Sequence, residues 1–207
     1  MPKLGMQPIR RQQLIEATIR SIGDVGFEQT TVSRIGRVAG VSPGIVHHYF
    51  GGKNELLEAT MRELLEQFRT SVVRALANAK TPRARVEALI DANFADDQFL
   101  PTVVAAWLAF WAQAPHYPKL HRLEQINARR LRSNLRHALH PLLPPGAVAP
   151  AADGLAAMID GLYLNCALDG HVNGARARRI VRQFLDCVLS SGAAGAAHAA
   201  PAITEAT

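Results

Sequence analysis

Residues 31–50 read TVSRIGRVAGVSPGIVHHYF, and this stretch decides the fold of the amino-terminal part of the chain. Thr31 is a residue type that caps helix amino termini, and apolar residues follow it at helical spacing. Gly40 supplies the left-handed residue that ends such a helix, and Ser42 followed by Pro43 is a typical start for the next one. The stretch therefore predicts a helix-turn-helix, in which the second helix lies in the major groove of DNA.

The charge distribution agrees with a phosphate-binding module at this end of the chain. The 207 residues carry a formal net charge of +6. Residues 1–53 hold seven Lys and Arg against three Asp and Glu, so this quarter of the chain has a net charge of +4. DNA-backbone contacts need such a basic surplus, although mild basicity is common among soluble proteins. Lys3, Arg10 and Arg11 form an arm that predicts either further phosphate contacts or a merely solvated segment.

The sequence around the helix-turn-helix resembles a known family. Residues 8–61 read PIRRQQLIEATIRSIGDVGFEQTTVSRIGRVAGVSPGIVHHYFGGKNELLEATM, which resembles the DNA-binding domain of TetR-family repressors. The opening MPKLGM, HYFGGK at 48–53 and LLEATM at 56–61 resemble the choline-responsive branch of that family, which represses glycine betaine synthesis. The resemblance implies an all-α repressor that binds a near-palindromic operator as a homodimer. It also implies choline as a small-molecule effector and no bound cofactor.

Eight residues in and just after the helix-turn-helix are candidates for DNA contact: Thr31, Arg34, Ser42, Gly44, His47, His48, Tyr49 and Lys53. The resemblance assigns Tyr49 and Lys53 to phosphates, with the lysine helped by the amino terminus of a following helix. The serine, glycine and histidines of the second helix are positioned for base edges or nearby phosphates, while Ile45 and Val46 are expected to pack inward. The alternative is structural, with the tyrosine at the rim of the core and either histidine half-buried.

One departure from the usual pattern of the family lies at Gly36, where alanine is usual. A glycine inside a helix costs roughly 0.5–1 kcal/mol relative to alanine. Propensity alone therefore predicts that Gly36→Ala raises the melting temperature and leaves operator binding intact.

The rest of the chain also reads as helices, without strand alternation or an internal repeat. The apolar spacing predicts about nine helices in all, and therefore an all-α fold. We expect a DNA-binding domain over residues 8–68 and a larger helical effector-binding and dimerisation domain over 69–191. Residues 192–207 are mostly Ala, Gly, Pro and Thr, a composition that predicts a disordered tail.

The last two predicted helices, over residues 151–168 and 175–190, carry more apolar surface than a helix pair can bury by itself. Their apolar residues are Leu155, Met158, Ile159, Leu162, Tyr163, Cys166, Ile180, Val181, Phe184, Leu185 and Val188. In the proteins that the sequence resembles, these helices pair with their copies across a two-fold axis. Pattern and resemblance together predict a homodimer whose two recognition helices lie about 34 Å apart or somewhat more.

Four residues are candidates for the effector site. A trimethylammonium head such as that of choline is bound by aromatic faces, with help from a carboxylate. Trp107 and Trp111 lie four apart on one face of a predicted helix, and Tyr163 can approach from another helix. Asp160 stands among apolar neighbours, where a charge is costly unless it is paired. The alternatives are that both tryptophans are ordinary core and that the aspartate pairs with an arginine at the dimer interface.

Other functional classes find little support in the sequence. No catalytic residue and no metal site is predicted, since the chain lacks a nucleophile elbow, a phosphate-binding glycine loop and a metal-ligand cluster. A TetR-type repressor of efflux or metabolic genes that senses a different, hydrophobic ligand is the nearest alternative, and an α-helical enzyme is disfavoured. Cys166 and Cys187 read as reduced thiols, and we expect a cytoplasmic protein, because neither a signal-peptide core nor a membrane-length apolar run is evident.

Overall fold

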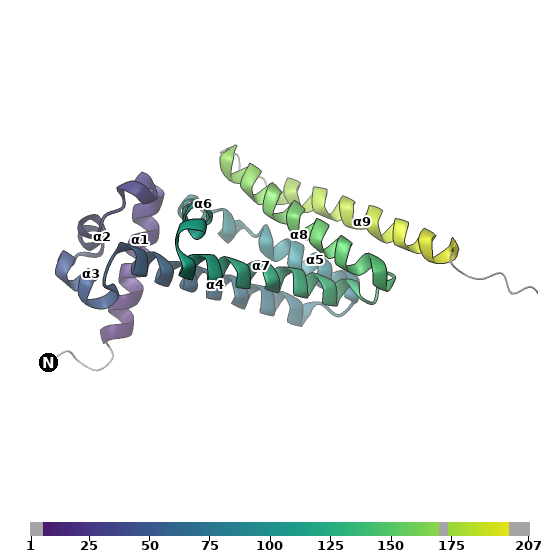
Figure 1. Cartoon of the computed structure of the whole chain (residues 1–207), viewed down its shortest axis with the longest axis horizontal. Coiled ribbons are helices and arrows are strands. Elements are labelled where there is room, and N and C mark those ends of the chain that lie inside the picture. The colour runs from purple at the N-terminus through teal and green to yellow at the C-terminus, as the bar shows by residue number, and fades with distance from the viewer. Residues whose placement is uncertain (1–5, 170–173, 199–207) are drawn as a thin grey trace, which may run out of the picture. The chain divides into compact units, whose positions relative to one another are not determined.

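The computed structural model describes residues 6–169 and 174–198, and this part of the chain consists of helices joined by turns (Figure 1). The all-α prediction is confirmed, with nine α-helices, two short 3-10 helices and no strand in the described residues. The elements are α1 (Met6–Gln29), α2 (Val32–Ala39), α3 (Pro43–Phe50), α4 (Lys53–Asn78), α5 (Pro82–Asn93), η1 (Asp96–Phe99), α6 (Pro101–Gln113), η2 (Ala114–His116), α7 (Pro118–Leu139), α8 (Pro145–Leu168) and α9 (Gly174–His198).

The chain divides by packing into two compact units. The first contains the described residues up to Ser71 together with Ala95–Asn127, and the second contains Val72–Phe94 and the described residues from Ala128 onward. Helices α4 and α7 therefore each begin in the first unit and end in the second. The expected boundary after residue 68 concerns function and stays a prediction.

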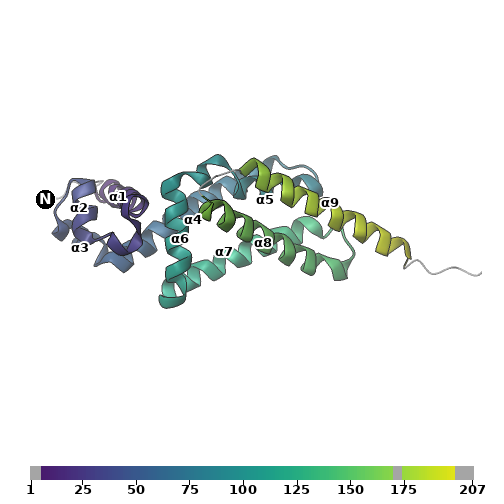
Figure 2. The same ribbon diagram turned by 90° about the horizontal axis from the view of Figure 1, so that it is seen from above.

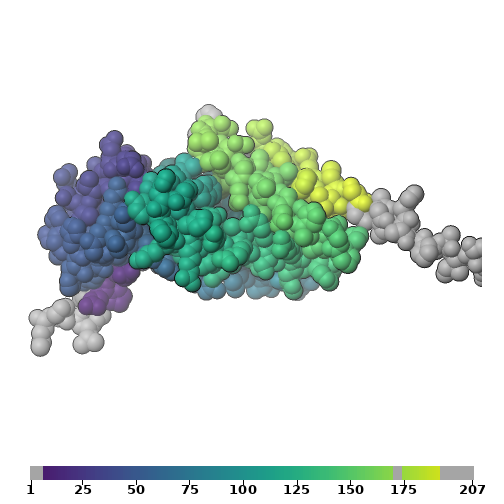
Figure 3. Space-filling view, viewed as in Figure 1, coloured from purple at the N-terminus to yellow at the C-terminus, as the bar shows by residue number. Residues whose placement is uncertain are grey.

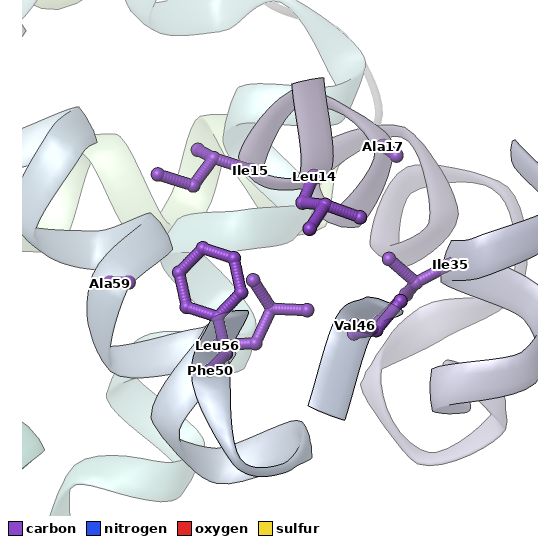
Figure 4. Close-up of a cluster of buried hydrophobic side chains, with 8 residues drawn as sticks. All are labelled: Leu14, Ile15, Ala17, Ile35, Val46, Phe50, Leu56 and Ala59. Atoms are coloured by element: carbon purple, nitrogen blue, oxygen red, sulfur yellow. The ribbon is translucent and has the colours of Figure 1, made fainter. Parts of the chain in front are cut away.

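A small apolar core in the first unit supports the helix-turn-helix. Helix α1 packs on α2, and α2 packs on α3. The buried side chains that meet in this core come from α1 (Leu14, Ile15, Ala17), α2 (Ile35), α3 (Val46, Phe50) and α4 (Leu56, Ala59), as Figure 4 shows. Each helix contributes one to three residues to this core, so none of these helices is stabilised alone.

Helix α1 also packs along α6, within the same unit. The two backbones approach closely at Gly23, where an added Cβ atom would lie 2.8 Å from the Cγ2 atom of Thr102. Helix α1 ends its regular geometry near this contact, because Gly26 adopts a positive φ of 76°. The helical hydrogen bonding resumes beyond this break as far as Gln29.

The second unit is organised around α9, which packs on both α5 and α8 (Figure 2). Charged contacts fix α5 against α9 along its length. Arg83 forms an ion pair of 2.6 Å with Asp186, and both oxygens of Asp91 accept hydrogen bonds from Arg182 at 2.6 and 2.7 Å. Arg178 donates to the carbonyl oxygen at the carboxyl end of α5. The α9 residues in these contacts are charged and lie outside the apolar row that this helix buries.

Two expectations about the last two helices need correction. Helix α9 continues through His198, because the alanines after Gly192 are strong helix formers, so the expected disordered tail does not begin at residue 192. Residues 199–207 lie outside the described residues. The second expectation was that no membrane-length apolar run is present. Helix α8 is nevertheless long enough and apolar enough to cross a membrane, with a mean hydropathy of 1.2. The core helix of a globular protein passes the same test, and α8 packs on α9 where Phe184 lies 3.5 Å from a Cβ placed at Gly154.

Candidate DNA interface and effector site

The turn between α2 and α3 is built as the sequence predicts, with one exception. The hydroxyl of Thr31 accepts a hydrogen bond of 3.1 Å from the backbone N–H of Arg34, which caps α2. Gly40 is left-handed, with a φ of 68°, and ends the helix. Ser42 occupies the N-cap position of α3, but its hydroxyl makes no capping bond. Its carbonyl oxygen instead accepts from the N–H of Ile45 at 3.0 Å, and Pro43 has no N–H that needs a partner.

The surface of α3 is where DNA contact is predicted, and the segment lies at the surface in the space-filling view (Figure 3). Gly44, His47 and His48 are exposed as expected. Ile45 was expected to pack inward, and this is wrong, since its side chain is 37% exposed. A helix of two turns has one inward row, which Val46 and its neighbour four residues on already fill.

The exposed isoleucine is a candidate that the sequence analysis missed. Ile45 stands on the same short helix as the exposed histidines. An apolar side chain in the major groove can read the methyl group of thymine, which no other base carries. The signal that could have located it is the i, i+4 spacing of Val46 and Phe50, which leaves only one inward row.

His47 and His48 have different surroundings. The Nδ1 atom of His47 lies 2.7 Å from the carbonyl oxygen of Gly51, just past the end of α3. The ring of His48 packs edge-on against Tyr49, with centroids 5.4 Å apart. Tyr49 is half-buried against the apolar core, so its position fits both the phosphate role and the role at the rim of the core.

The basic candidates are held by contacts to α1. Arg34 forms an ion pair of 3.4 Å with Asp24, which holds the arginine side chain toward α1. Lys53, the first residue of α4, donates to the carbonyl oxygen of Glu28 at 3.2 Å. A further cation lies nearby, since Arg11 stacks over the ring of Phe50 at 4.4 Å from its centroid. Lys3, the first residue of the predicted arm, lies outside the described residues.

Both tryptophans of the predicted effector site lie in an aromatic cluster on α6. Trp107 is buried and Trp111 is half-buried, with their ring centroids 5.8 Å apart. Phe110 lies 5.9 Å from Trp107, and Phe68 of α4 meets the same ring edge-on at 6.5 Å. The sequence analysis did not single out Phe68, because apolar spacing along a helix does not say which residue meets another aromatic ring.

Tyr163 and Asp160 belong to the second unit, on α8. Tyr163 is buried, and this burial raises the pKa of its phenol well above the ordinary value. Asp160 was expected to be surrounded by apolar side chains, and this is wrong for the protomer, because Asp160 is exposed. Ile159 and Tyr163 take the inward row of the helix four residues apart, which turns Asp160 outward. Its predicted roles, in ligand binding or at a dimer interface, stay predictions.

A cleft lies in the first unit between the starts of α4 and α7. It has a volume of about 330 Å³ and is lined by Asn54, Glu55, Glu58, Tyr117, Pro118, Lys119 and Leu120. The Glu58 side chain is 16% exposed and pairs with Arg62 at 2.8 Å and with Lys119 at 3.3 Å. Burial raises the pKa of this carboxyl, but the two cations outweigh it and hold the pKa below its ordinary range.

Comparison with known proteins decides the family. Residues 14–60 match the family described as "Bacterial regulatory proteins, tetR family", and residues 82–190 match "BetI-type transcriptional repressor, C-terminal". The HTH-type transcriptional regulator BetI 2 of Chromohalobacter salexigens is 48% identical over 193 residues, which cover 92% of this chain and 93% of that protein. The BetI regulator of Pectobacterium atrosepticum is 49% identical over 189 residues, which cover 90% and 97%. The chain belongs to the TetR family, with a BetI-type carboxyl-terminal domain.

Solved structures of TetR-family and related regulators share the fold. A putative transcriptional regulator from Pseudomonas aeruginosa PAO1 superposes with a TM-score of 0.78 at 26% identity, covering 88% of this chain and 91% of that one. A putative transcriptional regulator from Saccharomonospora viridis, solved in complex with choline, superposes with a TM-score of 0.74 at 20% identity, covering 85% and 95%. The second likeness shows the fold alone.

Membership of the TetR family fixes the general activity. The chain is a DNA-binding transcriptional repressor and not an enzyme, as its matched families and relatives are. Regulators of this family bind DNA operators and small-molecule effectors and typically dimerise. In the described part of the chain, no group of three or more His, Cys, Asp or Glu side chains could hold a metal ion.

Proposed function

We propose that this TetR-family repressor binds a near-palindromic operator as a homodimer in the cytoplasm, that it controls genes for converting choline to glycine betaine, and that choline is its effector. The names of its relatives, which are nearly half identical over most of the chain, support the gene class. The choline complex of the Saccharomonospora viridis protein, a structure of the same fold, supports the effector.

The observation that carries the proposal is the place of α6. This helix holds Trp107 and Trp111 and packs on α1 within the same compact unit as the helix-turn-helix. Aromatic faces attract a quaternary ammonium ion by cation–π interaction, which is worth about 2 kcal/mol or more when the cation is desolvated. Trp111 is half-buried and is therefore the tryptophan that presents more of its ring to a ligand.

The contact between α6 and α1 provides a route from the effector to DNA. The two helices are in close contact where Gly23 meets Thr102, since a Cβ atom at Gly23 would lie 2.8 Å from Cγ2 and 3.1 Å from Cα of the threonine. A shift of α6 at this contact is therefore expected to displace α1. Helix α1 in turn packs on α2. A hundredfold loss of operator affinity requires a coupling of only about 2.7 kcal/mol, which lies within the usual range for allostery.

Calorimetric titration of choline tests the effector proposal. Choline is titrated into the free repressor and into the repressor bound to an operator obtained by selection from randomised DNA. We expect binding to the free protein and weaker binding to the complex, since coupling between two ligands is reciprocal. Trp111→Ala should lose choline binding while it keeps operator affinity and a cooperative melting transition, and Trp111→Phe should keep part of the choline affinity. Choline binding that is absent in the unaltered protein, or unaffected by Trp111→Ala, would refute the proposal.

The α8 surface supports the dimer. Ala157, Gly161, Leu164 and Leu168 recur at helical spacing along one face and are exposed in the protomer, Leu168 by 69%. Small residues allow close approach of a second helix, and the leucines supply apolar area. We expect Leu168→Glu to convert the dimer to a monomer in sedimentation equilibrium. The matched control is Leu100→Glu, at a leucine that is 53% exposed at the start of α6 and should leave the dimer intact.

For DNA contact we propose two groups of residues. Ser42, Gly44, His47 and His48 meet base edges or adjacent phosphates, and Thr31, Arg34, Tyr49 and Lys53 meet phosphates. The exposure of the α3 residues supports the first group. Phosphate contacts affect all sequences alike, whereas base contacts affect particular operator positions, so selection from randomised DNA with single variants separates the two groups.

A further inference from the structure

Few hydrogen-bonding side chains on α3 are available to read bases. Among its exposed residues, Pro43, Gly44 and Ile45 have no hydrogen-bonding side chain, and only His47 and His48 do. Gly44 lies three residues before His47, on the same face of the helix. An added Cβ at Gly44 would have only the hydroxyl of Ser42 within 4 Å, at 3.8 Å. No side chain therefore projects from the helix surface at Gly44, and DNA can approach the neighbouring His47 ring closely.

The ring of His47 has one nitrogen already engaged. Its Nδ1 atom lies 2.7 Å from the carbonyl oxygen of Gly51, and a carbonyl oxygen can only accept a hydrogen bond. The hydrogen must therefore be on Nδ1. The direction of this carbonyl is set by the backbone of Gly51, with a φ of 83° and a ψ of −46°, and the positive φ favours glycine. In a neutral imidazole with hydrogen on Nδ1, the Nε2 atom carries a lone pair and is an acceptor.

An acceptor has few partners on duplex DNA. Phosphate oxygens are acceptors and cannot bind it, and the same holds for N7 of the purines, O6 of guanine and O4 of thymine. The donors in the major groove are the N6 amino group of adenine and the N4 amino group of cytosine. We propose that His47 is a specificity-determining residue whose Nε2 atom accepts a hydrogen bond from one of these amino groups, with Gly51 as the residue that sets its tautomer. The inference rests on the proposed base contact of α3.

The tautomer can be measured without DNA. Nitrogen-15 chemical shifts of the histidine rings distinguish hydrogen on Nδ1 from hydrogen on Nε2, and His47→Ala identifies the signal of this residue. At about pH 8, where imidazoles are mostly neutral, we expect hydrogen on Nδ1 for His47. His48, whose ring packs against Tyr49, provides an internal comparison. Hydrogen on Nε2 of His47 would overturn the proposal, whatever the operator is.

The base contact is tested by removing single groups from DNA. Selection with the unaltered repressor and with His47→Ala identifies the base pair whose preference depends on this residue. At that pair, adenine is replaced by purine, which lacks the N6 amino group, or cytosine by 2-pyrimidinone, which lacks N4. The unaltered repressor should lose roughly two- to tenfold in affinity, the effect of one hydrogen bond. His47→Ala should show no further loss on these DNAs.

Removal of an acceptor is the matched control. A 7-deazapurine at the same pair lacks the N7 acceptor and should bind the unaltered repressor as well as natural DNA does. A loss with the 7-deazapurine and none with the amino-deficient base would show that Nε2 donates, and would overturn the proposal. If no base pair depends on His47 while operator binding persists, the base contact is refuted and the repressor function stands.

Discussion

The side-chain nitrogen of Lys53 lies 3.2 Å from the carbonyl oxygen of Glu28, at the carboxyl end of α1. The same ammonium group lies 4.1 Å from the centre of the Phe27 ring. Three N–H groups are available on a lysine ammonium, and this carbonyl uses one of them. The cation is thus oriented before DNA binds, at the amino end of α4 and directly after the helix-turn-helix.

Lys53→Ala should weaken binding to all DNA sequences by a similar factor. The plot of log affinity against log salt concentration should become shallower by about one unit per recognition helix, because one phosphate contact is lost. Fluorescence anisotropy over a range of salt concentrations measures both quantities. Lys80→Ala, at an exposed lysine after α4, is the control and should leave the slope unchanged. An unaltered slope for Lys53→Ala would remove this residue from the phosphate contacts.

Gly44→Ala should separate folding from DNA binding. Its Cβ would make only an ordinary contact of 3.8 Å with the Ser42 hydroxyl in the free protein, and alanine in a helix is favoured over glycine by roughly 0.5–1 kcal/mol. We therefore expect a higher melting temperature together with a loss of operator affinity of about tenfold, comparable with a lost specific contact. Melting curves and operator titrations test the two effects. Unchanged operator affinity would show that DNA does not approach this part of α3 closely.

Gly36→Ala should fail to stabilise the repressor, contrary to what propensity alone predicts. The added Cβ would lie 2.8 Å from the carbonyl oxygen of Val41, a backbone atom that cannot rotate away. The turn is closed at the same place by a hydrogen bond of 2.8 Å from the Val41 N–H to the Gly36 carbonyl. We expect a melting temperature equal to or below that of the unaltered protein. A clear rise would contradict the close contact.

The ion pairs of Glu58 should give the stability a defined pH dependence. Arg62 and Lys119 hold the pKa of this carboxyl below its ordinary range, so the contribution is present above about pH 5 and is lost as the pH falls through the lowered pKa. We expect the difference in unfolding free energy between the unaltered protein and Glu58→Gln to be constant near neutrality and to shrink in acid. Denaturant titrations at several pH values measure it.

The matched control for that experiment is Glu66→Gln. Glu66 is also paired with an arginine, but its side chain is 57% exposed, and exposed pairs contribute little. The difference for this variant should stay small at every pH. A Glu58→Gln difference that does not change between neutral and acidic pH would contradict the proposed contribution of the pair.

The helices and the turn of the DNA-binding segment were predictable because their signals are local. The cap at Thr31 and the left-handed Gly40 each act within one turn of helix, and both are confirmed. The orientations of Ile45 and Asp160 were not predicted correctly. Both orientations depend on which row of side chains the helix buries, and the packing of the surrounding helices determines that row. Apolar composition near a residue does not settle which way its side chain points.

The candidate sites were predictable in part. The tryptophan pair follows from i, i+4 spacing, and the structure brings the two rings together. Phe68 joins them from α4, a helix far away in sequence, and no periodicity indicates that meeting. The hydrogen bond from His47 to Gly51 and the close approach at Gly36 depend on distances of a few ångströms, which residue types alone do not reveal.

The packing of α6 on α1 has a consequence for recombination between regulators. A chimaera that joins this helix-turn-helix to the sensor of a relative, with the junction after residue 68, would place a foreign helix against α1. The new partner would have to fit at Gly23, where Thr102 leaves no room for an additional methyl group. Functional hybrids are therefore expected to inherit α1 and α6 from the same parent, and the two helices should be exchanged together as a single cassette.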